Sequence, residues 1–96
     1  MNFNSIPEIF QSRVRLAVIS ALLTGDKTFS QIKGITHAAD GSLNMHLVKL
    51  EKIKFVSSKK EFVDKKPRST YSLTQTGKTE FKEYVKLLEQ ILKELK

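Results

Sequence analysis

Apolar residues recur at helical spacing in the first quarter of the chain. Within residues 12–23, the sequence SRVRLAVISALL returns an apolar side chain to the same helical face on each turn. Ser12 can cap the start of this helix, and Gly25 lies just past its end. Residues 6–10 can form a separate short helical turn that starts around a proline. The pattern predicts a central helix preceded by a short one.

A second, shorter helix is expected after residue 28. Thr28 and Gln31 fit a capping box, in which each side chain accepts a hydrogen bond from the backbone N–H of the other residue. Gly34 and the Ile-Thr-His run that follows it weaken the continuing helix. We therefore expect this helix to end close to His37.

The third predicted helix spans residues 41–53, with Asp40 as its N-cap. Leu43, Leu47 and Leu50 recur at intervals of four and three residues, so they share one face. The opposite face carries small, polar and basic residues. Such a helix can be purely structural, or it can lie against a partner molecule.

Two short β runs predict a hairpin over residues 55–63 and 69–73, with residues 64–67 as its turn. Tyr71 and Leu73 alternate with polar residues, as expected for a strand with one buried face. An isolated two-stranded hairpin is at best marginally stable in water. We therefore expect this face to pack on the helices and the basic tip to project towards a partner.

The last predicted helix follows the cap residue Thr74 and spans residues 75–95. Its apolar residues recur at the 3-4-3-4 spacing of a coiled-coil seam. This stripe could fold back on the domain or pair with a second copy, and we favour the second copy. The predicted dimerisation residues are Phe81, Tyr84, Val85, Leu88, Ile91, Leu92 and Leu95.

The distribution of charge indicates a class of partner. The net charge is +7, and residues 41–72 hold eight Lys and Arg against three acidic residues, a local excess of 8 − 3 = +5. Clustered positive charge attracts polyanions such as nucleic acid or an anionic membrane. A soluble surface that happens to be basic is the plainer explanation of the same pattern.

Composition argues against other classes of protein. The chain has no cysteine, and therefore no disulfide or thiolate metal site. Its longest apolar run, residues 16–23, is too short to cross a membrane. Its first ten residues show no signal-peptide pattern. We therefore expect a cytoplasmic protein. It has no Gly-rich phosphate loop, nucleophile-elbow serine or metal-spaced histidine pair. We expect no enzyme activity, catalytic residue, metal or cofactor.

The order of these segments resembles a known family. The segments SRVRLAVISALL, TFSQIKGI, DGSLNMHLVKLEKIKFV, EFVDKKPRSTYSLT and TQTGK together are similar to small winged helix-turn-helix transcriptional regulators of the MarR and ArsR groups. The resemblance covers residues 6–95. It implies a mainly α fold with a small β-hairpin (α+β), as a single domain over residues 1–96. Residues 6–77 would form the winged helix-turn-helix core, and residues 78–96 the C-terminal dimerisation helix.

The resemblance also implies a site. The third helix would be the recognition helix in a DNA major groove, and the hairpin would be the wing, along phosphates or in the minor groove. Asn can pair with adenine, Ser can donate or accept, Met can touch a thymine methyl, and Lys suits phosphates. The implied recognition-helix contacts are Gly41, Ser42, Asn44, Met45, His46, Lys49 and Lys52. The implied wing contacts are Lys59, Lys60, Lys65, Lys66, Arg68 and Ser69.

The chain departs from the family pattern at three turns. Relatives commonly have Gly where this chain has His37, Lys54 and Lys65. If the backbone there needs positive φ, each lysine costs about 1 kcal/mol, whereas histidine is better tolerated. The alternative is that these turns adopt another geometry.

For His46 we favour a plain role, packing or a phosphate hydrogen bond, over pH sensing or metal binding.

Two function hypotheses follow. The first is a sequence-specific regulator that binds double-stranded DNA as a homodimer. The second is a winged-helix adaptor for protein interaction, or an unspecific nucleic-acid-binding module; Met45 and Val48 favour an adaptor, and the basic wing argues against it. No small-molecule effector is evident, because the chain lacks the Cys and His sites of metal-sensing relatives and leaves little room for a ligand cleft. A cleft at the dimer interface near Phe81 and Tyr84 stays open.

Overall fold

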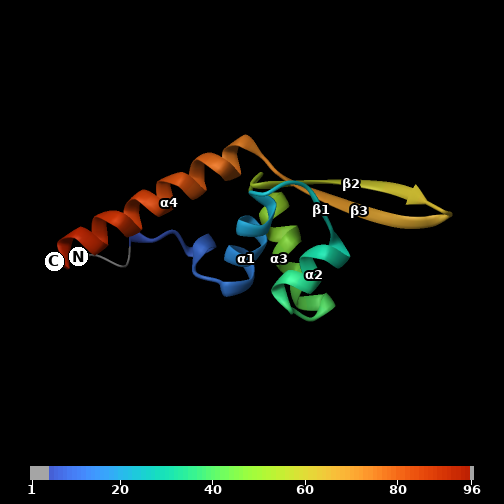
Figure 1. Cartoon of the computed structure of the whole chain (residues 1–96), viewed down its shortest axis with the longest axis horizontal. Coiled ribbons are helices and arrows are strands. Elements are labelled where there is room, and N and C mark those ends of the chain that lie inside the picture. Colours follow the sequence, from blue (N-terminus) through green and yellow to red (C-terminus); the bar gives the residue numbers. More distant parts are fainter. Residues whose placement is uncertain (1–4, 96) are drawn as a thin grey trace.

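A small helical body carries a β-hairpin on one side and a long helix on the other (Figure 1). The structure is a computed structural model, and it describes residues 5–95. The molecule measures 56 × 26 × 21 Å, because the hairpin and the last helix extend in opposite directions. In chain order the elements are η2 (Glu8–Phe10), α1 (Arg13–Leu22), β1 (Lys27–Thr28), α2 (Phe29–Thr36), α3 (Asp40–Lys52), β2 (Val56–Val63), β3 (Lys66–Leu73) and α4 (Gln75–Glu94).

The architecture confirms the predicted α+β winged-helix class and adds one strand. The three-stranded antiparallel sheet has the order β1-β3-β2, with Lys27 opposite Tyr71. Strand β1 was not predicted. A polar strand of two residues carries no alternation of its own, and only its pairing with β3 defines it.

The core forms where α1, α2 and α3 meet the sheet. Leu43, Leu47 and Leu50 of α3 are buried as predicted, and so are Tyr71 and Leu73 of β3. The hairpin therefore persists because its inner half is part of the core. The largest fully buried side chains are Val18, Ile19, Ile32, Leu43, Leu47 and Leu50.

Local caps start most of the helices where they were expected. Thr28 Oγ1 accepts from the Gln31 N–H, and Gln31 Oε1 accepts from the Thr28 N–H, which confirms the capping box. The prediction that Asp40 caps α3 is wrong. The N-cap is Ala39, without a side-chain hydrogen bond, and Asp40 lies in the first turn with its carboxylate paired to Lys33. A negative charge in the first turn is favourable because it faces the positive end of the helix dipole.

All three positions where relatives commonly carry Gly adopt positive φ. His37, Lys54 and Lys65 have φ values of 57°, 69° and 64°. The predicted four-residue turn at 64–67 is wrong, because Asp64 also has positive φ, at 52°, and β3 already begins at Lys66. Two successive left-handed residues are the requirement of a type I′ turn, whose twist matches the flanking strands. The wing is therefore a regular hairpin that is longer than predicted.

Aromatic rings attach α4 to the body. The ring of Phe10 lies 4.5 Å from that of Tyr84 and stacks on it, and it lies 6.0 Å from Phe55 and 6.3 Å from Phe81, centroid to centroid. Phe81 and Tyr84, predicted as dimerisation residues, thus pack at least partly on their own chain. In the C-terminal half of the same stripe Leu88, Leu92 and Leu95 are exposed, Leu92 by 58%, whereas Ile91, also predicted for dimerisation, is only 7% exposed within its own chain.

Gly77, in the first turn of α4, lies against Phe55 and Leu73 at the inner end of the hairpin. Thr74 Oγ1 accepts from the Gly77 N–H at 3.0 Å and lies 2.6 Å from the Lys54 carbonyl oxygen, to which it donates. A Cβ at Gly77 would run into the carbonyl oxygen of Phe55 and would lie 2.7 Å from Leu73 Cδ1. Backbone cannot move aside as a flexible side chain can, so only Gly fits this contact.

We expect Gly77→Ala to lower the free energy of unfolding by about 1–3 kcal/mol, the usual cost of overpacking. The matched control is Gly34→Ala in α2, where a Cβ meets nothing within 4 Å. This control should raise stability by up to about 1 kcal/mol, because Ala is the better helix former. Urea unfolding of both variants checks the pair. Equal stability of the two would contradict the close packing of α4 on the sheet.

Candidate nucleic-acid interface

The outer face of α3 is the first candidate surface. Because its leucines are buried, the helix turns Gly41, Asn44 and Lys52 outwards, together with Met45 (62% exposed) and Val48 (54% exposed). Ser42 is half-buried at the edge of this face. The predicted residues Gly41, Asn44, Met45 and Lys52 are therefore accessible to a partner.

The wing carries the second group of predicted residues. Lys60, Lys65, Lys66 and Arg68 are exposed, and Ser69 is half-buried. Lys59 Nζ lies 3.4 Å from Glu61 Oε1 on the same strand, an exposed ion pair of small energetic value. All the predicted wing cations therefore face solvent, and of these Lys59 is paired with an acid.

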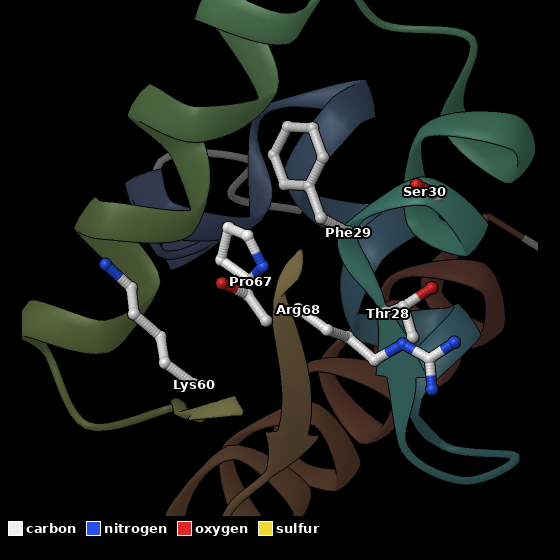
Figure 2. Close-up of a pocket in the computed structure, with 7 residues that line it drawn as sticks. Thr28, Phe29, Ser30, Lys60, Pro67 and Arg68 are labelled. Carbon is white, nitrogen blue, oxygen red and sulfur yellow. The ribbon is translucent and has the colours of Figure 1, made fainter. Parts of the chain in front are cut away.

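A groove joins the wing to the start of α2 (Figure 2). It has a volume of about 480 Å³ and is lined by Thr28, Phe29, Ser30, Lys60, Pro67, Arg68 and Ser69. The N-terminal end of α2, whose first backbone N–H groups have no acceptor within the helix, thus lies beside cationic wing residues. Residues 28–30 were not predicted as part of the site. The capping box located the start of α2, but only the fold brings it next to the wing.

The family is now identifiable from this arrangement and from sequence comparison. The sequence pattern of the winged helix DNA-binding domain matches residues 14–92. This chain belongs to the winged helix DNA-binding domain family.

Similar proteins support the assignment. The protein MJ0432 of Methanocaldococcus jannaschii, described as uncharacterized, is 33% identical over 92% of this chain and 97% of its own length. A transcriptional regulator homologue of Pyrococcus horikoshii OT3 is 30% identical, with a TM-score of 0.82 over 91% of this chain and 87% of that one. A protein of Enterococcus faecalis V583, described as a MarR-family regulator, shares the fold at 19% identity, with a TM-score of 0.76 over 91% and 79% of the two chains. These structural neighbours are described as regulators, not as enzymes.

Two predicted recognition-helix contacts of this winged-helix domain have partners on other elements of the chain. His46 Nδ1 lies 3.2 Å from Nη1 of Arg15, and Lys49 Nζ lies 3.2 Å from Glu8 Oε2. Arginine only donates, so Nδ1 of His46 accepts and its Nε2 carries the proton. Neither pairing could be predicted from local spacing, because the partners lie 31 and 41 positions away.

Arg15 is the centre of this charged cluster, and its residue is only 6% exposed. Its Nε donates to the Ile9 carbonyl oxygen at 2.8 Å, and its Nη2 donates to both the carbonyl oxygen and Oε1 of Glu8 at 3.1 Å. Arg15 is thus both paired with an acid and buried.

The cluster shifts two pKa values. The hydrogen bond from Lys49 lowers the pKa of Glu8, with further lowering by the charges of Lys49 and Arg15 against a smaller opposing effect of desolvation. Burial lowers the pKa of His46, and the nearby charges of Arg15 and Lys49 add to the effect. His46 is therefore neutral in the folded winged-helix domain near neutral pH.

Two further features of the described part of the chain bear on function. Within residues 5–95, no group of three or more His, Cys, Asp or Glu side chains could hold a metal ion. None of the helices in that range is both long and apolar enough to span a bilayer.

The lowered pKa of His46 predicts a loss of stability on acidification. Below the ordinary histidine value of 6.5, the unfolded chain takes up a proton that the folded chain resists, so stability is present above that value and falls as the pH drops through the folded pKa. His46→Gln, which keeps an acceptor for Arg15, should flatten this slope.

The control is His37→Asn, at an exposed left-handed position that Asn tolerates. This variant should keep the wild-type slope in a thermal unfolding series across pH. An unchanged slope in His46→Gln would contradict the assigned role of His46.

Proposed function

We propose that this protein is a sequence-specific transcriptional regulator that binds double-stranded DNA as a homodimer in the cytoplasm. The observation that carries the proposal is the surface formed by the outer face of α3, the start of α2 and the basic wing. In support of it, the start of α2 and the cationic wing line one groove, and the outer face of α3 is exposed.

The outer face of α3 suits a major groove. A groove about 12 Å wide admits one α-helix, and the N-terminal turns of a recognition helix reach base edges. Asn44 can make two hydrogen bonds to an adenine, and Met45 can contact a thymine methyl group. Gly41 adds no side chain, which permits a close approach of the helix to the DNA.

The wing and the groove suit phosphates. Lys60 and Arg68 line the groove shared with the start of α2, where backbone N–H groups and the Ser30 hydroxyl add donors. Lys65 and Lys66 at the tip would extend the contact along the backbone. We expect Lys49 to contribute less to phosphate binding than the wing cations, because its ammonium group is paired with Glu8.

The exposed half of α4 supports a homodimer. Leu88, Leu92 and Leu95 remain exposed along a helix that extends away from the body (Figure 1). Pairing with α4 of a second copy would bury them at the seam spacing. A two-fold dimer would read half-sites separated by about one helical turn or a multiple of it.

One observation favours a second candidate function. Met45 and Val48 give α3 an apolar outer strip, which also suits a protein partner. An adaptor of this kind would not need the cations of the wing.

Replacing Lys65, Lys66 and Arg68 by Ala separates these functions. We expect DNA affinity to fall across all sequences, and the slope of log K against log salt to decrease in magnitude by about 0.9 for each phosphate that the wing no longer neutralises. Binding is measured on a duplex selected from a random pool, over a salt series. The control removes three exposed lysines of α4, Lys78, Lys82 and Lys93, and should leave the slope unchanged.

Two results would count against the regulator. If selection enriches no sequence over random duplex, sequence-specific binding is wrong, and unspecific binding remains. If the wing variant binds DNA as the wild type does, the wing is not the phosphate contact.

The dimer has a separate test. Leu88→Gln combined with Leu92→Gln should convert the protein from dimer to monomer, because the substitutions place polar groups in the seam. Sedimentation equilibrium over a range of concentrations measures the mass. The control is Leu23→Gln, a leucine of similar exposure to Leu88 that lies outside α4. A wild-type protein that is monomeric throughout the range would rule out this interface.

A further inference from the structure

An aromatic side chain stands in solvent near the tip of the wing. Phe62 in β2 is 81% exposed, the largest exposed fraction of any large apolar side chain between residues 5 and 95. Full burial of such a side chain is worth about 1.5–3 kcal/mol. Phe62 belongs neither to the core nor to the contacts of α4 with the body. A side chain of this kind gains free energy if a partner covers it, and its surroundings indicate which partner fits.

The strand register fixes the face on which Phe62 lies. It stands opposite Pro67, and the pair two residues further in is Lys60 with Ser69. Side chains two residues apart share a face, so Phe62 and Pro67 continue the face that begins with buried Tyr71. Pro67, Lys60 and Ser69 also line the groove beside α2 (Figure 2). Phe62 thus extends the proposed DNA-binding face outwards.

The hairpin geometry presents Phe62 and Pro67 as one apolar unit. In a two-residue hairpin the residues next to the turn, here Val63 and Lys66, form the hydrogen-bonded pair. The next pair is the closer, non-hydrogen-bonded type, with facing Cα atoms about 4.5 Å apart. Pro67 is therefore the cross-strand neighbour of Phe62, and its missing N–H costs no bond to β2.

The charges around Phe62 specify its partner. Lys60 lies two residues further in on the same face, and Lys65 lies beside Asp64 in the turn beyond it. Lys66 pairs with Val63 on the opposite face, where Glu61 is paired with Lys59. An apolar ring on a wing tip with an excess of cations fits a partner that presents an apolar surface between rows of negative charge. The minor groove of duplex DNA has this character, since deoxyribose and base edges lie between two phosphate strands.

The reach of the wing agrees with this partner. From Ser58, opposite buried Tyr71, to Phe62 the strand advances four residues, or about 14 Å at 3.4 Å per residue. Major and minor grooves alternate within a helical turn of about 34 Å, so their centres lie roughly 17 Å apart. A wing anchored beside α3 can therefore carry Phe62 over one phosphate strand.

We propose that Phe62, with Pro67 as its cross-strand neighbour, is a minor-groove wedge that packs against deoxyribose and opens a base step beside the site read by α3. The inference rests on the proposed function and adds to it a residue that determines specificity. Apolar wedges favour steps that unstack easily, such as TA and CA/TG. The wing thereby selects sequence through DNA deformability, without a hydrogen bond to a base.

The test compares Phe62→Ala with Val63→Ala. Val63 is adjacent and apolar but lies on the opposite face of the hairpin, so it controls for the removal of apolar area at the tip. Phe62→Ala should weaken binding to the selected duplex about 10- to 100-fold, as expected from the burial of an aromatic ring. Its salt slope should stay at the wild-type value because no phosphate contact is removed.

Two further readouts belong to the same experiment. The preference for a pyrimidine–purine step at the wing position should disappear in Phe62→Ala and persist in Val63→Ala. Phe62→Leu, which keeps an apolar wedge, should retain most of the affinity. Binding to vesicles of phosphatidylglycerol and phosphatidylcholine should not depend on Phe62.

Each contrary outcome overturns the proposal in a distinct way. Unchanged affinity and step preference in Phe62→Ala, with specific binding by the wild type, would refute the wedge and leave the regulator standing. Weaker binding with a reduced salt slope would mean that Phe62 only holds the hairpin in shape. Vesicle binding that depends on Phe62, without an effect on DNA, would assign the ring to a lipid surface. A wild type that selects no duplex would refute wedge and regulator together.

Discussion

The buried guanidinium of Arg15 is the contact on which the arrangement of the other parts depends. A charge that is 6% exposed is tolerated only if its donors are satisfied, and here it donates to η2 through Glu8 and Ile9 and to α3 through His46. Removing one partner of such a group costs several kcal/mol, because a buried charge is left unpaired. A lysine could not replace it, since a single ammonium lacks the fork that reaches both elements. Arg15 thus holds η2, α1 and α3 in one relative position.

This contact connects the helix proposed to face DNA with the helix proposed to face a second copy. Phe10 ends the segment held by Arg15, and its ring stacks on Tyr84 of α4 at 4.5 Å. His46 is bonded to Arg15, Arg15 donates to the carbonyl oxygen of Ile9, and the next residue, Phe10, stacks on Tyr84. In a dimer, the angle between α3 and α4 would set the separation of the two recognition helices. The same contacts would therefore determine the spacing of half-sites that the protein accepts.

Features set by neighbours in the chain could be predicted from the sequence, and those set by distant contacts could not. The capping box of Thr28, the leucine face of α3 and the buried side of β3 each follow from residues close to one another in the chain. Strand β1 was missed because only its pairing with β3 defines it. Asp40 was wrongly predicted as a cap, because its carboxylate pairs with Lys33. Lys49 was predicted as a phosphate contact, and its pairing with Glu8, 41 positions away in the chain, could not be foreseen from the sequence. The importance of Phe62 depends on its exposure, which no periodicity reveals.

In the proposed complex, the outer face of α3, the start of α2 and the wing form one DNA-binding surface. Chemical-shift mapping of the backbone amides, during titration with a selected duplex, tests this surface as a whole. We expect the largest changes to cluster at residues 28–30, at Gly41 to Met45 and along the wing, while residues 88–95 change little. Changes concentrated on α4, or on the face of α1 remote from the wing, would contradict a DNA-binding surface built from these three parts.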